Sequence, residues 1–144
     1  MKKTLLIFIA TFLFSFEVKE FVTCKNVINL TPVEITDTFD VNDSKVYAFA
    51  YLTDIKENKN IDFIWEKEVN GEWRLYTDVS LPIYTGPRWR TYSYIKIRPY
   101  FVGNWRVSLF DGNKTIKTLY FKIKDNNVSS QNTLSDNWWN NKNF

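Results

Sequence analysis

The chain has 144 residues, of which 44% are hydrophobic and 18% aromatic, and its formal net charge is +3. This length supports one modest hydrophobic core, so a single domain is expected. The chain has no histidine and one cysteine, which excludes the usual histidine-activated nucleophile and any internal disulfide. Its four scattered glycines form no phosphate-binding loop, and no catalytic residue, cofactor or metal is expected.

Residues 1–24 are expected to form a signal segment with its c-region. "MKK" supplies a positive n-region, and "TLLIFIATFLFSF", residues 4–16, is an apolar run of h-region length. This run is too short to span a bilayer comfortably, so no transmembrane span is expected after cleavage. Neither cleavage after Ser15 nor cleavage after Cys24 fits the small-residue rule well, and a lipoprotein reading of Cys24 lacks the small residues of a lipobox. The protein is predicted to be periplasmic or secreted.

The charge of the exported chain gives no indication of a nucleic-acid partner. Loss of residues 1–24 removes three lysines and two glutamates, which leaves a net charge of +2. A nearly neutral domain offers no electrostatic attraction for a polyanion, so no nucleic-acid partner is expected. An exported protein without an internal disulfide must be held together by burial and hydrogen bonding.

The chain after an expected linker at 25–32 consists of apolar runs of strand length, separated by glycine, proline and asparagine. A first short strand is expected at 33–36. Residues 46–52 are apolar on both alternating faces, which is typical of a central strand.

Two hairpin signals divide the rest of the domain. The Asn70-Gly71 pair is the strongest short hairpin signal in the chain, and "DGN" at 111–113 is the second. About seven strands with regular turns and no helical period predict an all-β domain, an antiparallel immunoglobulin-like sandwich over residues 33–124. The Asn-rich residues 125–144 have no periodicity and are expected to be a disordered tail.

Seven segments between residues 45 and 123 occur in an order that resembles a known bacterial family. They are "VYAFAYLTD", "IDFIW", "RWRTYS", "IRP", "GNWRV", "LFDGNKTI" and "YFKI". The order resembles the domain-of-unknown-function family numbered 2914, whose pattern is matched here by Trp65, Arg90, Thr91, Ser93, Gly103, Trp105 and Arg106. The family often has a histidine where this chain has Phe63. The resemblance implies a small all-β module of exported or membrane-attached bacterial proteins and supplies no activity.

Three tryptophans are the expected centre of the core. Trp65, Trp89 and Trp105 each lie on the more apolar side of their predicted strand. Their indole N–H groups, and hydroxyl groups such as that of Ser93, need hydrogen-bond partners once buried.

The opposite face is the candidate ligand site. Alternation places four side chains outward: Arg90, Tyr92, Arg106 and Tyr76. If their strands are neighbours, they form a platform of arginine and tyrosine that suits a sugar, a peptide or an acidic partner segment. The alternative is that Arg90 and Arg106 pair with acids such as Asp62 or Asp78 and brace the sheet.

Other polar groups are weaker candidates. Glu66 and Glu68 would project from one strand face about 7 Å apart, a separation compatible with inverting glycoside hydrolysis, although a solvated strand face explains them more simply. Residues 37–43, "DTFDVND", offer oxygen ligands without the spacing of an EF-hand, and local turn caps are the simpler interpretation.

Three Asp-x-Asn-x-Ser/Thr runs resemble a bacterial glycosylation acceptor, and turn chemistry explains them equally well. They begin at Asp40, Asp111 and Asp125.

These features predict a noncatalytic binding or interaction module on the envelope side or in the periplasm, with an envelope protein or a polysaccharide as partner. The alternatives are a carboxylate-dependent glycoside hydrolase and a carbohydrate-binding module.

Overall fold

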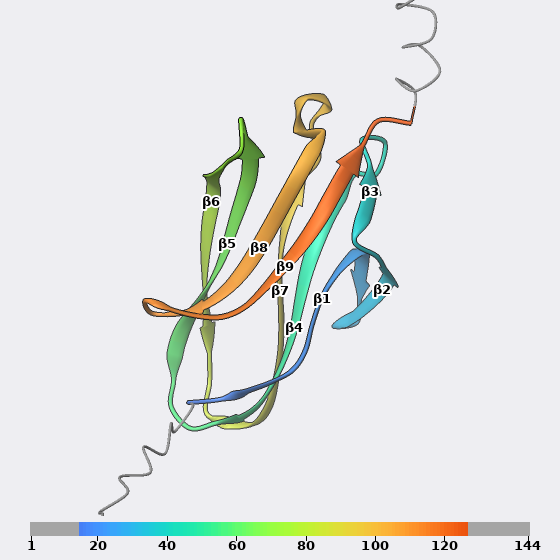
Figure 1. Cartoon of the computed structure of the whole chain (residues 1–144). Helices are drawn as coiled ribbons and strands as arrows, with labels where there is room; N and C mark the ends of the chain where they lie inside the picture. The colour runs from blue at the N-terminus through green and yellow to red at the C-terminus, as the bar shows by residue number, and fades with distance from the viewer. Residues whose placement is uncertain (1–14, 127–144) are drawn as a thin grey trace, which may run out of the picture.

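The computed structural model describes residues 15–126, which form two β-sheets packed face to face (Figure 1). The four-stranded sheet has the order β2 (Thr31–Ile35), β1 (Glu17–Ile28), β4 (Lys45–Ile55) and β7 (Gly86–Lys96). The five-stranded sheet has the order β3 (Thr38–Asp40), β9 (Lys114–Lys124), β8 (Gly103–Asp111), β5 (Lys59–Val69) and β6 (Glu72–Ile83). A short 3-10 helix, η1, spans Pro99–Phe101.

The predicted all-β sandwich is confirmed, with nine strands in the described range instead of about seven. The pairs of neighbouring strands are antiparallel except for β3 and β9, which run parallel. No helix among the described residues is long and apolar enough to cross a membrane.

The domain begins earlier than the sequence predicts. The expected linker at 25–32 and the expected start at 33 differ from the structure, because β1 occupies residues 17–28 and pairs with the central strand β4. The charges that resemble a c-region belong to a strand whose Glu17 and Lys19 face solvent while Phe21 is buried. At the other end β9 stops at Lys124. The expectations for residues 1–14 and 127–144 lie outside the described residues.

The first described residues are attached to the sandwich by specific contacts. Phe16 is buried in the core, and the Ser15 hydroxyl donates a hydrogen bond of 2.9 Å to the Asp111 carboxylate. Lys59 donates to the Ser15 oxygen at 3.0 Å and forms an ion pair of 2.9 Å with Asp111. Burial alone would lower the pKa of Lys59, but its bonds to Asp111 and Glu57 outweigh that effect and raise it.

The core lies between the sheets, and its largest buried side chains are aromatic. Trp65 of β5 and Trp105 of β8 are almost completely buried, and both pack against Phe121 of β9. Trp89 of β7 is only partly buried at the side of the same cluster, where its ring meets Tyr84 at 5.2 Å.

Both buried indoles have hydrogen-bond partners. The Trp65 Nε1–H donates to the hydroxyl oxygen of Ser93 on β7 at 3.1 Å, which links the five-stranded sheet to the four-stranded sheet. The Trp105 Nε1–H donates to the carbonyl of Phe101 in η1 at 2.7 Å. Satisfied polar groups in the core avoid the desolvation cost of about 1–3 kcal/mol that each would otherwise impose.

Two hairpins follow the sequence signals. Asn70 and Gly71 have φ angles of +53° and +79°, the left-handed conformation that a tight turn between β5 and β6 requires. Asp111 pairs with Lys114 across the turn between β8 and β9.

We expect Ser93→Ala to lower the free energy of unfolding by about 1–3 kcal/mol, because it leaves the buried Trp65 N–H without an acceptor. Urea denaturation measures the loss, and Ser80→Ala on the exposed side of β6 is the matched control, expected to change stability by less than about 0.5 kcal/mol. In a Trp65→Phe background the loss should shrink, since no N–H remains to be left unpaired. An equal loss with and without the indole would show that this bond does not join the sheets.

Candidate ligand-binding surface

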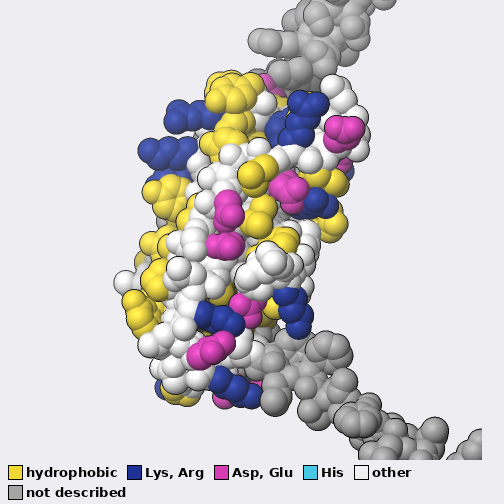
Figure 2. Space-filling model, turned by 90° about the vertical axis from the view of Figure 1, so that its left-hand side faces the viewer, with side chains coloured by type: hydrophobic (Ala, Val, Ile, Leu, Met, Phe, Trp, Pro, Cys, Tyr) yellow, Lys and Arg dark blue, Asp and Glu magenta, His cyan; other side chains and the backbone are white. Residues whose placement is uncertain are grey.

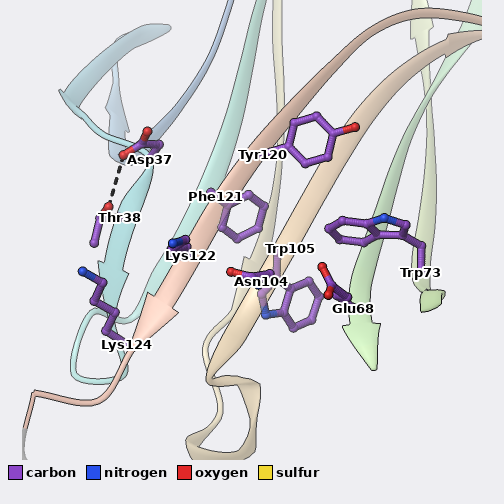
Figure 3. Close-up of a pocket in the computed structure, with 10 residues that line it drawn as sticks. All are labelled: Asp37, Thr38, Glu68, Trp73, Asn104, Trp105, Tyr120, Phe121, Lys122 and Lys124. Carbon is purple, nitrogen blue, oxygen red and sulfur yellow. Dashed lines mark hydrogen bonds between the residues drawn. The ribbon is translucent and has the colours of Figure 1, made fainter. Parts of the chain in front are cut away.

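A hollow of about 500 Å³ lies on the outer face of the five-stranded sheet (Figure 3). We call it the outer groove, and its lining residues are Asp37, Thr38, Glu68, Trp73, Asn104, Trp105, Tyr120, Phe121, Lys122 and Lys124. In Figure 3 the labelled side chains extend from Trp73 and Glu68 at one end to Asp37 and Thr38 at the other. Its volume lies within the range of about 300–1,000 Å³ typical of small-molecule sites.

The strand register explains why these side chains meet. Trp73 of β6 is paired with Glu68 of β5, Asn104 of β8 with Lys122 of β9, and Lys122 with Thr38 of β3. Directly paired residues project from the same face of a sheet, with strands about 4.8 Å apart. The groove is therefore a row of side chains across the five strands.

One wall of the groove is a fixed cluster of charged and aromatic side chains. Arg106 donates two hydrogen bonds, of 2.9 and 3.0 Å, to the two carboxylate oxygens of Glu66. Its guanidinium lies 4.6 Å from the centre of the Trp73 ring, and Trp73 meets Tyr120 edge to face at 5.8 Å. The hydrogen bond to Glu66 raises the pKa of Arg106. This cluster keeps Trp73 in place beside the groove.

The predicted platform of arginine and tyrosine does not form one surface. Arg90 and Tyr92 lie on β7 in the four-stranded sheet, whereas Arg106 lies on β8 in the five-stranded sheet. Their outward faces are on opposite sides of the sandwich. Alternation gives each side chain's face within its strand, but it does not say which sheet contains the strand.

Tyr76 also differs from its predicted outward position. Trp65 pairs with Thr77, but the next residue, Glu66, pairs with Leu75, so Tyr76 is an extra residue in a β-bulge. A bulge changes the alternation along a strand. The Tyr76 ring is partly exposed and packs edge to face on Phe101 and on the core residue Trp105.

Arg90 has local partners on its own sheet. Its guanidinium donates to the Leu30 carbonyl, in the turn between β1 and β2, at 3.2 Å and lies 4.7 Å from the Tyr51 ring centre. No ion pair joins Arg90 to an acid within residues 15–126. The alternative that an arginine pairs with an acid and braces the sheet therefore applies to Arg106. Its partner is Glu66, not Asp62 or Asp78.

The two candidate catalytic carboxylates have different environments. Glu66 is occupied by the bidentate pair with Arg106, whereas Glu68 lines the outer groove. A general acid must present a protonated oxygen to the leaving group, whereas both carboxylate oxygens of Glu66 accept hydrogen bonds from Arg106.

The acidic residues 37–43 form turn caps. The Asn42 backbone N–H donates to the Asp40 carboxylate at 2.8 Å, and the Asp40 N–H donates to the Asp43 carboxylate at 2.9 Å. The Asn42 N–H also lowers the pKa of Asp40. Within the described chain, no group of three potential metal-ligating side chains is found.

Alternation along β9 separates the residues that face the groove from those that face the core. Leu119, Phe121 and Ile123 alternate with Tyr120, Lys122 and Lys124, and the structure turns the second set outward. Their juxtaposition with Trp73 and Glu68 depends on the order of strands in the sheet, which local alternation does not contain.

Comparison with protein families supports the expected resemblance. Residues 58–123 match the model of a family described as "Protein of unknown function (DUF2914)". This segment resembles DUF2914, as the sequence pattern predicts. The match runs from β5 almost to the end of β9, so it contains most of the outer groove. It does not include "VYAFAYLTD" in β4, which the sequence resemblance assigns to the family pattern. The DUF2914 description brings no activity, and no curated protein matches the chain.

Solved structures resemble this chain at very low sequence identity. A DNA glycosylase, AlkC, from Pseudomonas fluorescens, bound to DNA with an abasic site analogue, is 7% identical, with 76% of this chain and 30% of that chain covered and a TM-score of 0.53. An immunoglobulin-like protein from Pseudomonas aeruginosa is 10% identical over 76% and 96% of the two chains, with a TM-score of 0.49. A β-glucosidase from Listeria innocua is 7% identical over 75% and 15%, with a TM-score of 0.46. The chain thus spans less than a third of the glycosylase, and that likeness concerns the fold alone.

Arg106 should contribute more to stability than Arg90. We expect Arg106→Ala to lower the free energy of unfolding by about 1–2 kcal/mol, because it leaves the partly buried Glu66 carboxylate unpaired. Arg90→Ala should cost less than about 1 kcal/mol, because only one hydrogen bond and one exposed ring contact are lost. Thermal and urea unfolding measure both. Equal losses would mean that the Glu66 pair does not brace the five-stranded sheet.

Proposed function

We propose that the protein is a noncatalytic binding module on the envelope side or in the periplasm of a bacterial cell, and that the outer groove is its ligand site. The supporting observation is a hollow bordered by aromatic rings in which Glu68, Asn104 and Lys122 point outward from a rigid sheet. Rigid strands hold polar groups more accurately than loops do. The carboxylate held by Arg106 argues against Glu66 as a hydrolytic acid.

Export is supported by the positive "MKK" and the apolar residues 4–16. Cleavage after Ser15 would keep Phe16 and the whole of β1 in the domain. Cleavage after Cys24 would remove the part of β1 that pairs with β4 from Glu17 to Cys24. An N-terminal lipid on Cys24 would make Cys24 the first residue and remove Glu17–Thr23 from β1, and the Cys24 side chain is completely buried. We therefore place processing shortly before Phe16.

The surface charge is consistent with a partner that is not a polyanion. Figure 2 shows acidic and basic side chains interspersed with hydrophobic ones on one side of the molecule. An envelope protein or a polysaccharide remains the proposed partner class.

A sedimentation experiment tests this function. The full chain is expressed, its exported form is recovered, and the fraction that sediments with a washed envelope preparation is measured. Intact mass should show a chain that starts at Phe16 or a few residues before it. Tyr120→Ala should lower the bound fraction about fivefold or more, because an exposed aromatic in a site commonly contributes over 1 kcal/mol. Tyr94→Ala, an exposed tyrosine of the four-stranded sheet, is the matched control and should bind like the wild type.

Three results would contradict the proposal. One is a mature chain that starts after Cys24. Another is equal loss of binding in Tyr94→Ala and Tyr120→Ala, which would remove the outer groove as the site. The third is glycan hydrolysis by the wild type that disappears in Glu68→Gln, which would make the module an enzyme.

A further inference from the structure

The outer groove contains polar groups that the described chain does not use. Neither a hydrogen bond nor an ion pair joins the side chains of Glu68, Asn104 or Lys122 to other residues between 15 and 126. In Figure 3 the one hydrogen bond drawn among the lining residues joins Thr38 to Asp37. These groups offer a carboxylate acceptor, an amide that both donates and accepts, and an ammonium donor within one row.

The charges of the lining balance each other. The carboxylates of Asp37 and Glu68 oppose the ammonium groups of Lys122 and Lys124, and the charge of Arg106 is neutralised by Glu66. A polyanion would meet the carboxylates, and a basic segment would meet the lysines. The lining therefore favours a ligand that is neutral and rich in hydrogen-bonding groups.

The aromatic rings supply the apolar part of the site. Tyr120 is 61% exposed, and Trp73 stands next to it at 5.8 Å. A sugar ring presents apolar C–H faces that pack on aromatic rings, and hydroxyl groups that both donate and accept hydrogen bonds. An aliphatic ligand offers the apolar face but not the hydroxyl groups.

The site is longer than one sugar ring. A second hollow of about 380 Å³ shares Asn104, Lys122 and Lys124 with the outer groove and continues toward Val102. Five neighbouring strands span about 19 Å from the first to the last. Two adjoining hollows suit a chain of several units better than a monosaccharide.

We propose that the outer groove binds a neutral oligosaccharide chain. Tyr120 packs against one sugar ring beside Trp73, while Glu68, Asn104 and Lys122 hydrogen-bond to hydroxyl groups along the chain. This inference rests on the proposed function, because it names the ligand class of that binding module.

Isothermal titration calorimetry of the full chain tests it with cellohexaose, maltohexaose, hexa-N-acetylchitohexaose and an oligogalacturonate of the same length. At least one neutral hexasaccharide should bind, and its own monosaccharide should bind at least about tenfold more weakly. Tyr120→Ala and Asn104→Ala should each weaken binding about tenfold. Tyr94→Ala and Lys96→Ala, on the four-stranded sheet, are the matched controls, and thermal unfolding checks that every variant is folded.

Failure of the ligand class and failure of the module are distinguishable. If no neutral hexasaccharide binds, or the oligogalacturonate binds more tightly, the saccharide proposal is wrong. Should Tyr120→Ala still reduce envelope binding in that case, the groove remains a binding site for another ligand. Neutral saccharide binding that is equal in Tyr120→Ala and the wild type would also overturn the proposal, because it would place the sugar elsewhere.

Discussion

The hydrogen bond from Trp65 to Ser93 is the constraint on which the sandwich depends. The indole is completely buried, and Ser93 on the opposite sheet accepts its N–H at 3.1 Å. An unpaired N–H at this depth would be costly, so β5 and β7 must face each other at this point. The single cysteine leaves the domain without a disulfide, and this bond with the rings around Phe121 determines how the two layers meet.

The outer groove follows from the same arrangement. Because Trp65 points into the core, its neighbour Glu66 points outward and reaches Arg106, and the bulge beside them places Trp73 over Arg106. Gly103 opens β8 at a φ of +140°, where a side chain would approach the Lys67 ammonium at 3.2 Å. A residue with a side chain would be strained there. The packing of the core thus decides which polar side chains line the groove.

Local sequence patterns predicted the positions of the strands better than they predicted which side chains lie together on the surface. Alternation and the Asn70-Gly71 turn identified the other strands but not β1 or β3, and apolar faces identified Trp65 and Trp105 as core residues. The charged start of β1 resembled part of an export segment. Its exposed residues Glu17 and Lys19 obscure the strand pattern, although Phe21, two residues later, is buried. The face of Tyr76 depended on a bulge, and the separation of Arg90 from Arg106 depended on sheet order, which arises from contacts distant in sequence.

Amide chemical-shift mapping of the isotope-labelled full chain during titration with a neutral hexasaccharide tests most directly whether the five-stranded sheet is the ligand-binding face. The proposed site predicts the largest changes around Asn104 and Lys122 and at the Trp73 indole N–H, with little change on β4 and β7. Changes centred on Arg90 and Tyr92 would contradict it and place the ligand on the four-stranded sheet.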